Sequence, residues 1–344
     1  MEKIVQGVGD VAIGAASDAA VLARLVGSLR ELKQQIHAVM VGQEPVIDSV
    51  LCCMLAGGHC IVQGVPGLAK TLLVHSVAEA LDMSFNRVQF TPDLMPSDIT
   101  GTDIIQESSE TRQRSYEFVK GPIFANMILA DEINRTPPKT QSALLQAMQE
   151  REVTVSGRTY KLERPFFVQA TQNPIEQEGT YPLPEAALDR FMFMIYIDYP
   201  NAADELQIVK RTTTGRAVAL KRVLSREEML QFQDVVKRAP VSDAVMEYCV
   251  RLARASRPGE AGASAMVKKY LKWGAGPRAS QYMTLGAKAL ALMDGRITPS
   301  YQDVKQVCPL VLRHRIVPNF EAEADGVSVE SIVADILQHT PVPK

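Results

Sequence analysis

The chain has 344 residues, of which 46% are hydrophobic and 22% charged. This length exceeds the usual size of one domain, so two domains are expected, and the composition is that of a globular protein. Lys and Arg (37) nearly balance Asp and Glu (39), which leaves a net charge of −2. That balance argues against a protein that grips nucleic acid through a strongly basic surface.

The cysteines and the N-terminus indicate where the chain works. Its five cysteines form no CxxC pair, a pattern that favours buried thiols in a reducing compartment. No apolar run approaches the roughly 20 residues of a membrane span. The Ala-rich N-terminal stretch is interrupted by Asp18 and Arg24 and lacks a basic start, so we reject a signal peptide. We expect a cytoplasmic protein without a membrane span.

The first part of the chain reads as a loose segment followed by two helices. Residues 1–20 are rich in Gly and Ala, and we expect them to be a flexible N-terminal segment. Apolar residues then recur at three- and four-residue spacing over 21–39, which predicts an amphipathic helix. Val41-Gly42-Gln43 interrupts this pattern, and Pro45 begins a second helix that reaches about Ala56.

The stretch from Gly64 to Thr71 resembles a phosphate-binding loop. It reads Gly-Val-Pro-Gly-Leu-Ala-Lys-Thr, follows a short apolar run and opens a helical pattern. In such a loop, backbone N–H groups and the helix N-terminus surround the phosphates, the lysine neutralises charge, and the hydroxyl reaches Mg²⁺. The usual motif has Gly where this chain has Ala69. The alternative is an ordinary strand–turn–helix junction.

Short apolar runs predict five strands, at about 59–63, 85–90, 126–130, 166–171 and 192–197. Helical patterns separate most of them, which indicates a mainly parallel sheet covered on both faces. Residues 99–120 and 152–165 alternate polar and apolar residues around a turn, so each predicts a β-hairpin.

Polar residues stand at the ends of three of these strands. Asp131 and Glu132 end the third strand, where Asp131 would hold a metal opposite Thr71 and Glu132 would polarise the attacking water. Asn173 follows the fourth strand and could orient that water. The alternative for the acids is a buried strand that simply ends in two solvated carboxylates. For Asn173, the alternative is the start of a turn at Asn173-Pro174.

Two arginines could stabilise phosphoryl transfer. Arg190 stands directly before the last strand, and Arg278 follows Pro277 at the start of a helix. Arginine spreads positive charge over the transferred group and can come from a neighbouring subunit. A surface ion pair with Asp189 would be the ordinary explanation for Arg190. At a helix start the dipole disfavours a cation, so Arg278 hints at an anionic partner.

After Pro200 the strand signal disappears and helical patterns take over. They cover 204–213, 226–238, 242–256, 278–293, 300–314 and 327–338. The Gly-, Ala- and Lys-rich segment from Arg257 to Gly276 reads as a mobile connection. We therefore divide the chain into a flexible segment (1–20), an α/β domain (21–200), a linker (201–224) and a helical domain (225–344).

These motifs, in this order, resemble an AAA+ ATPase. Within that group, the phosphate loop and the run from Ala170 to Phe191 closely resemble the MoxR family, over about residues 25–315. The resemblance implies an α/β class P-loop AAA+ core. It would have a five-stranded parallel sheet in an αβα sandwich, a helix-2 insert and a pre-sensor 1 hairpin, followed by an all-α lid.

The resemblance also assigns roles to residues. Lys70 and Thr71 would be the Walker A lysine and Mg²⁺-hydroxyl residues, Asp131 and Glu132 the Walker B pair, and Asn173 sensor 1. Arg190 would be the arginine finger that reaches the neighbour's ATP, and Arg278 the sensor 2 contact. The remaining nucleotide contacts would come from Val41, Gly42, Gln43, Gly64, Val65, Pro66, Gly67, Leu68, Ala69 and Leu72. Ala before the Walker lysine is frequent in this family, and we expect Ala69 to have right-handed helical dihedrals, where a methyl group costs little.

The resemblance finally implies a function. Such proteins form rings, usually hexamers, that bind ATP and Mg²⁺ and remodel or mature other proteins. They commonly work with von Willebrand factor A-domain partners, with metal-cofactor insertion as one output. One alternative is a nucleic-acid motor of the same clade. The net charge argues against it, and so does the hairpin turn, which has a single basic residue, Arg158. Another alternative is a small-molecule kinase. The water-activating Glu132 and the two arginines argue against that class of enzyme.

Overall fold

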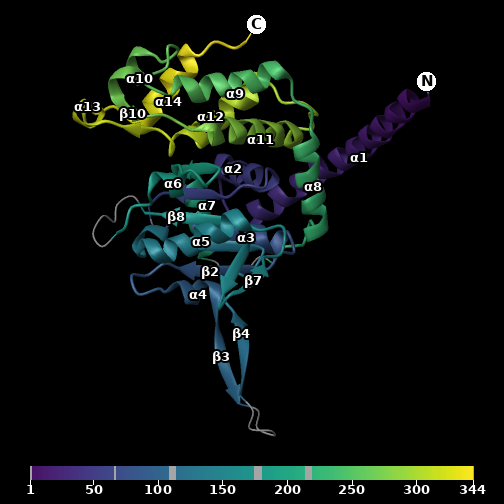
Figure 1. Ribbon diagram of the computed structural model, residues 1–344, viewed down its shortest axis with the longest axis vertical. Helices are drawn as coiled ribbons and strands as arrows, with labels where there is room; N and C mark the ends of the chain where they lie inside the picture. Colours follow the sequence, from purple (N-terminus) through teal and green to yellow (C-terminus); the bar gives the residue numbers. More distant parts are fainter. Residues whose placement is uncertain (1, 66, 108–113, 174–179, 214–218, 344) are drawn as a thin grey trace. The chain divides into compact units, whose positions relative to one another are not determined.

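A computed structural model describes residues 2–65, 67–107, 114–173, 180–213 and 219–343, with side chains from Ala20 onward except at Ser115 (Figure 1). The chain divides into two compact units. The α/β unit comprises residues 35–50 and 57–226, and the helical unit comprises residues 1–34, 51–56 and 227–344.

The α/β unit is built on a five-stranded parallel sheet, as predicted. Its strand order is β2–β5–β8–β1–β9. The strands are β1 (Cys60–Gln63), β2 (Phe85–Gln89), β5 (Met127–Asp131), β8 (Phe167–Gln172) and β9 (Phe193–Tyr196). Because the neighbours in the sheet are not consecutive in the chain, helical crossovers must connect them, and both faces become covered.

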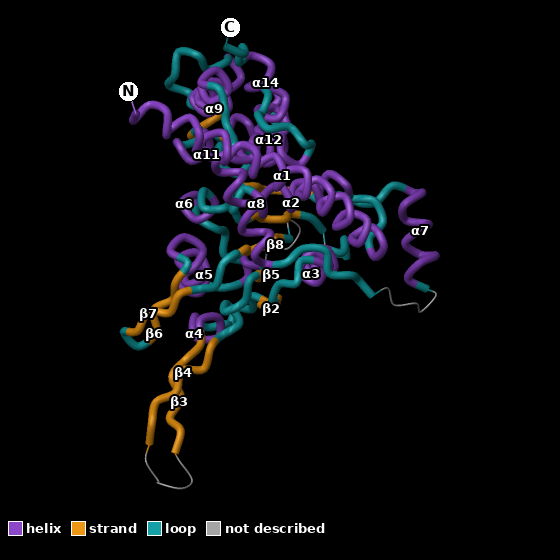
Figure 2. The backbone as a smooth tube through the Cα atoms, turned by 90° about the vertical axis from the view of Figure 1, so that its right-hand side faces the viewer, coloured by secondary structure: helices purple, strands orange, loops and turns teal. Residues whose placement is uncertain are grey.

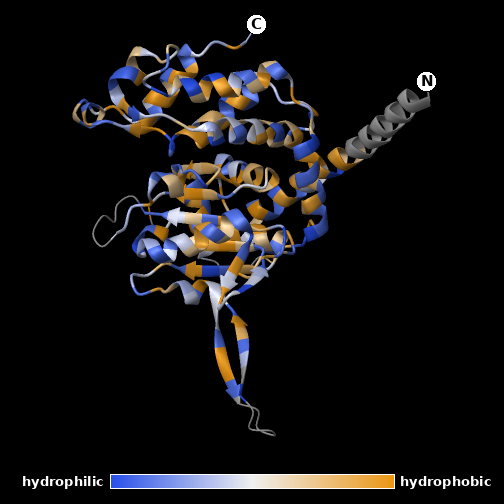
Figure 3. Ribbon diagram, viewed as in Figure 1, coloured by the Kyte–Doolittle hydropathy of each residue, from blue (hydrophilic) through white to orange (hydrophobic). Residues whose placement is uncertain are grey.

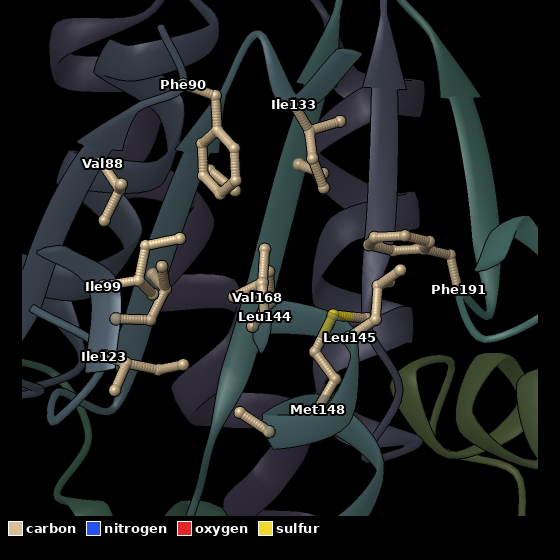
Figure 4. Close-up of a cluster of buried hydrophobic side chains, with 14 of the residues drawn as sticks. Val88, Phe90, Ile99, Ile123, Ile133, Leu144, Leu145, Met148, Val168 and Phe191 are labelled. Carbon is tan, nitrogen blue, oxygen red and sulfur yellow. The ribbon is translucent and has the colours of Figure 1, made fainter. Parts of the chain in front are cut away.

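Helices cover both faces of this sheet. On one face, α5 (Pro138–Glu150) places Leu144, Leu145 and Met148 in a buried cluster with residues of the sheet such as Ile128 and Val168 (Figure 4). The buried side chains of α3 (Lys70–Ala80) lie outside that cluster, so α3 covers the other face. Figure 3 shows hydrophobic residues gathered on the central strands. The predicted αβα sandwich is confirmed.

A buried histidine ties strand β1 to the layer beneath it. His59 Nδ1 accepts a hydrogen bond from the Val168 N–H at 3.0 Å, and its Nε2 lies 3.3 Å from the Met148 carbonyl oxygen. The ring is therefore a neutral tautomer that donates from Nε2. Burial lowers its pKa from 6.5 to about 4, because the interior disfavours the charged form.

Both predicted hairpins are present in the α/β unit (Figure 2). The first pairs β3 (Gly101–Glu107) with β4 (Arg114–Lys120), and the second pairs β6 (Glu152–Val155) with β7 (Arg158–Lys161). The ring of Phe118 stacks on that of Tyr160 at 4.1 Å between centroids, so the two hairpins contact each other. The other elements of the unit are α4 (Pro96–Thr100), η1 (Ile133–Arg135), α6 (Glu185–Leu188) and α7 (Ala202–Thr212).

The helical unit has its own core. Tyr248, Leu252, Met283 and Val307 are buried there, on α9, α11 and α12. Its elements are α9 (Asp243–Ala255), α10 (Ala265–Tyr270), β10 (Leu271–Trp273), α11 (Pro277–Met293), α12 (Tyr301–Leu312), β11 (Val317–Pro318), α13 (Phe320–Ala324) and α14 (Val329–His339). Three helices contribute residues to both units: α1 (Glu2–Val39), α2 (Glu44–Leu55) and α8 (Arg226–Arg238). All five cysteines of the chain are buried thiols.

The structure has regular secondary structure in two segments that we expected to be loose. Helix α1 begins at Glu2 rather than near Val21. The first proline of the chain is Pro45, and the many alanines of the segment favour a helix. The expected flexible segment over residues 1–20 is thus helical from its second residue.

The second correction concerns the segment from Arg257 to Gly276, which is structured and not a mobile connection. The Ser264 side chain accepts a hydrogen bond from the Val267 N–H at 3.1 Å and so caps α10. Strand β10 pairs with β11. A side chain at Gly274 would lie 2.3 Å from the Ser256 carbonyl oxygen, so this glycine serves a close backbone approach rather than flexibility.

No helix in the described ranges combines the length and the hydropathy that a membrane crossing requires.

Candidate active site

The sheet register brings the predicted site residues to one edge. Thr171 of β8 pairs with Val62 of β1, and Ala130 of β5 pairs with Ala170 of β8, so Asp131 lies level with Thr171. Because all strands are parallel, Asn173 and Gly64 follow β8 and β1 at this same carboxyl edge. The loop after β1 and the acids of β5 therefore flank the central strand β8.

The backbone of the loop explains its two glycines. A Cβ atom at Gly64 would lie 2.3 Å from Cγ2 and 2.6 Å from the carbonyl oxygen of Ile197, so only glycine fits against the end of β9. Gly67 has a φ of 85° and open space beside its Cα. A left-handed residue of this kind turns successive N–H groups toward one concave side, as an anion site requires. The predicted contact Pro66 lies outside the described residues.

Ala69 does not have the conformation that we expected. Its φ of 57° and ψ of 24° lie in the left-handed region, directly before the first residue of α3. The argument that its methyl group costs little in a right-handed helical conformation is therefore wrong. The methyl group is tolerated here at the cost of local strain, on the order of 1 kcal/mol. The loop requires a chain reversal before the helix, and Ala69 supplies it.

Lys70 begins α3 with its charge turned back over the loop. Its Nζ donates a hydrogen bond of 2.6 Å to the carbonyl oxygen of Gly64. This contact places the ammonium group beside the loop backbone. Thr71, the next residue, is half-buried in the first turn of the same helix.

Asp131 is held by two neighbours that the sequence did not reveal. Its Oδ2 accepts hydrogen bonds from Arg87 Nη2 at 2.7 Å and Nε at 3.2 Å. Its Oδ1 accepts one from the Thr171 hydroxyl at 2.5 Å. The carboxylate is 13% exposed, so its charge is partly desolvated and these partners compensate it.

Glu132 stands in a strained turn directly after the strand. Its φ is 56°, and its N–H donates to the buried Thr171 hydroxyl at 2.9 Å. The carboxylate Oε2 accepts from Gln89 Nε2 at 2.8 Å and from Arg135 Nη1 at 2.9 Å. Left-handed residues of this kind concentrate at functional sites. The Thr171 hydroxyl thus holds both acids, and the side chains of Gln89 and Arg135 orient the carboxylate of Glu132.

One sequence signal could have identified some of these partners. Arg87 and Gln89 are two polar residues spaced by two on a strand, so they lie on one face, which is unusual for a strand of a parallel sheet that is covered on both faces. For Thr171 and Arg135 the sequence carries no comparable signal.

A cavity of about 180 Å³ lies beside the loop. Six of the residues that line it were predicted nucleotide contacts: Val41, Gln43, Gly67, Leu68, Ala69 and Leu72. The other six were not predicted from the sequence: Val39, Met40, Pro200, Ile208, Arg211 and Thr212. Gln43 Nε2 donates to the Asp198 carbonyl oxygen at 2.9 Å, and a Cβ at Gly42 would lie 2.6 Å from Asp204 Oδ2. These contacts fix the Val41–Gln43 segment. The mostly apolar walls suit a flat aromatic base next to a phosphate site.

Comparison with known proteins places this site in a family. The profile of the ATPase family associated with various cellular activities (AAA) matches residues 59–193, and that of the AAA lid domain matches residues 263–336. The chain is 42% identical to Chaperone MoxR1 of Mycobacterium tuberculosis, over 94% of this chain and 84% of that protein. The chain belongs to the MoxR family of AAA+ ATPases.

Further relatives agree with this assignment. Protein MoxR of Paracoccus denitrificans is 30% identical over 91% of this chain and 96% of its own length. The crystal structure of a protein from Cytophaga hutchinsonii, assigned as an ATPase, shares 38% identity with a TM-score of 0.89. The match covers 96% of this chain and all of that one. The family supports ATP binding and a chaperone-like role, and the α/β AAA+ fold with a helical lid is confirmed.

The two arginines of this MoxR-family chain lie in different places. Strand β9 is parallel to β1, with Phe193 level with Cys60, so Arg190 starts at the sheet edge opposite to Gly64. Four paired residues alone separate the two edges by roughly 13 Å, at about 3.3 Å each. Arg278 is the second residue of α11 in the helical unit, and its sensor 2 role stays a prediction.

The donor set at the sheet edge fits Mg²⁺. The described part of the chain contains no group of three or more His, Cys, Asp or Glu side chains that could hold a metal. Mg²⁺ usually binds through one or two protein oxygens together with waters and substrate phosphates, whereas Zn²⁺ and Ca²⁺ need a fuller protein cage. Thr71 and Asp131 provide a hydroxyl and a carboxylate of the required kind.

Proposed function

We propose that this chain hydrolyses ATP to ADP and phosphate and uses the energy to remodel or mature protein complexes. One observation carries the proposal: the β5–β8–β1 register gathers Gly64, Asp131, Glu132 and Asn173 at one sheet edge. That is the position where open α/β sheets bind their ligands.

The residues of the loop would bind the nucleotide. Backbone N–H groups of Gly64, Gly67, Leu68 and Ala69 and the start of α3 would surround the phosphates. Lys70 would exchange its bond to the Gly64 carbonyl for a phosphate oxygen. The cavity beside Val41 and Gln43 would hold the adenine. Thr71 and Asp131 would hold Mg²⁺, which neutralises charge on the phosphates when it is bound.

Glu132 would act as the general base. Among the described residues, Gln89 and Arg135 both bond to its Oε2, which leaves Oε1 to accept a proton from water. The Thr171 hydroxyl holds the backbone of Glu132, so the carboxylate is oriented before substrate arrives. Asn173, which is buried at the same edge, would orient the water.

Arg190 would act on the ATP of a neighbouring copy. It starts at the edge opposite to its own loop, which is the placement expected for a residue that works in trans. Family members form rings, so we propose a ring, usually a hexamer, with each ATP shared by two chains. Arg278 would follow the γ-phosphate and couple it to the helical lid.

The output is proposed by analogy with relatives. The name of Chaperone MoxR1 states a chaperone role for that protein, and we extend it to this chain. A von Willebrand factor A-domain partner, protein clients, metal-cofactor insertion and a cytoplasmic location belong to the same proposal. The net charge of −2 favours protein clients over nucleic acid.

The Glu132→Gln variant tests this function. It keeps the size and the hydrogen bonding of the side chain but cannot accept the proton, so we expect ATP binding to persist while phosphate release falls about a hundredfold or more. Glu150→Gln is the matched control, since Glu150 is exposed and accepts a hydrogen bond from Gln146 on its own helix, away from the sheet edge. Parental turnover in Glu132→Gln, or transfer of phosphate to a metabolite, would contradict the proposal.

A further inference from the structure

Arg87 joins the two acids of the site into one network. It lies on β2, outside the phosphate-binding loop. Its Nη2 donates to Asp131 Oδ2 at 2.7 Å and to Gln89 Oε1 at 2.9 Å. Gln89 in turn donates to Glu132 Oε2. Arg87 therefore touches the metal-facing acid directly and reaches the general base through one amide.

Hydrogen bonds already engage both carboxylate oxygens of Asp131 that a cation would use. Arg87 takes Oδ2 of Asp131 with two donors, and Thr171 takes Oδ1. A divalent cation, or a water of its hydration shell, must approach the same oxygens. It would also meet a guanidinium of like charge a few ångströms away, which disfavours its binding.

The exposure of the pair shows which partner can leave. The side chain of Arg87 is 49% exposed, whereas that of Asp131 is 13% exposed. The carboxylate is held at the strand end and the guanidinium borders solvent. Because about half of the Arg87 side chain already borders solvent, water can take up its donors when it turns outward, and Thr171 keeps Asp131 in place.

We propose that Arg87 is a latch on the metal-binding carboxylate. It occupies Asp131 in the nucleotide-free chain and leaves Oδ2 when Mg²⁺–nucleotide binds. The same movement breaks its hydrogen bond to Gln89. This inference rests on the proposed function.

The test is the Mg²⁺ dependence of nucleotide binding in Arg87→Gln, measured by fluorescence anisotropy with a slowly hydrolysed ATP analogue. Loss of the competing cation should lower the half-saturating Mg²⁺ concentration about three- to tenfold, the range expected for a partly exposed charge pair. In a second assay without nucleotide, Mg²⁺ should raise the thermal midpoint of unfolding of both proteins. The rise should begin at a lower Mg²⁺ concentration for Arg87→Gln than for the parent. Arg222→Gln, which removes an exposed pair with Asp82 and the same charge, should match the parent.

The outcomes separate the latch from the ATPase. Equal half-saturation in Arg87→Gln and the parent, with both binding the nucleotide, would overturn the latch and leave the proposed function standing. If the parent bound no Mg²⁺–nucleotide at all, both would fall. If Arg87→Gln does not fold, Arg87→Lys keeps the charge but loses the paired donors. A smaller shift in the same direction would then support the latch, and no shift would overturn it.

Discussion

The Thr171 hydroxyl is the point at which the site can be perturbed most cleanly. It is fully buried, donates to Asp131 Oδ1 at 2.5 Å and accepts from the Glu132 N–H at 2.9 Å. Thr171→Val keeps the shape and removes both bonds. A neutral hydrogen bond contributes about 1 kcal/mol and one to a charged group about 1.5–3 kcal/mol. Because Arg87 still compensates Asp131, we expect a loss of about 2–3 kcal/mol in the free energy of unfolding.

The catalytic effect follows from Glu132. Its left-handed backbone conformation costs about 1–3 kcal/mol and persists only while neighbours hold it. Without the Thr171 acceptor the turn relaxes and Glu132 loses its orientation. Each 1.4 kcal/mol of lost transition-state stabilisation lowers the rate tenfold, so ATP turnover should fall about ten- to a hundredfold. Urea denaturation and phosphate release measure the two effects. Thr171→Ser keeps the hydroxyl and should retain most activity, whereas parental stability and turnover in Thr171→Val would refute the reasoning.

Two further predictions concern the backbone of the loop and the buried histidine. Ala69→Gly relieves a left-handed alanine, which is worth about 1 kcal/mol, but adds chain entropy to the unfolded state. The free energy of unfolding should therefore rise by up to about 0.5 kcal/mol, and a loss of stability in chemical denaturation would contradict the assigned conformation. His59 has a folded-state pKa of about 4, below its ordinary 6.5, so the unfolded chain takes up the proton first. The contribution of neutral His59 to the free energy of unfolding is fully present above about pH 6.5. It is lost as the pH falls toward 4, and the loss reaches up to roughly 3 kcal/mol. His59→Gln should flatten the stability profile between these pH values in urea titrations, and an unchanged slope would show that His59 is not responsible.

The sequence was sufficient for the parts of the fold that local pattern determines. Apolar runs located all five sheet strands, and turn signals located both hairpins. The loop and the acids Asp131 and Glu132 could be found because they directly follow strands, and parallel strands end at one edge. These features depend on residues close together in the chain.

What sequence could not supply depends on distant pairings or on exact dihedral angles. Arg87 and Thr171 meet Asp131 only because β2, β5 and β8 are neighbours in the sheet, an order that spacing along the chain does not fix. The conformation of Ala69 is set by closure of the loop. The segment from 257 to 276 was misjudged because its composition suggested flexibility, whereas a cap and the pairing of β10 with β11 order it.

The shared ATP site is the central claim, and mixing two inactive variants tests it most directly. Lys70→Ala removes the phosphate contact and leaves Arg190, whereas Arg190→Ala keeps the loop and removes the group that acts in trans. We predict that each variant alone is inactive, and that a mixture regains ATP hydrolysis because some interfaces combine an intact loop with an intact arginine. An inactive mixture, under conditions where mixed rings are shown to form, would contradict the account.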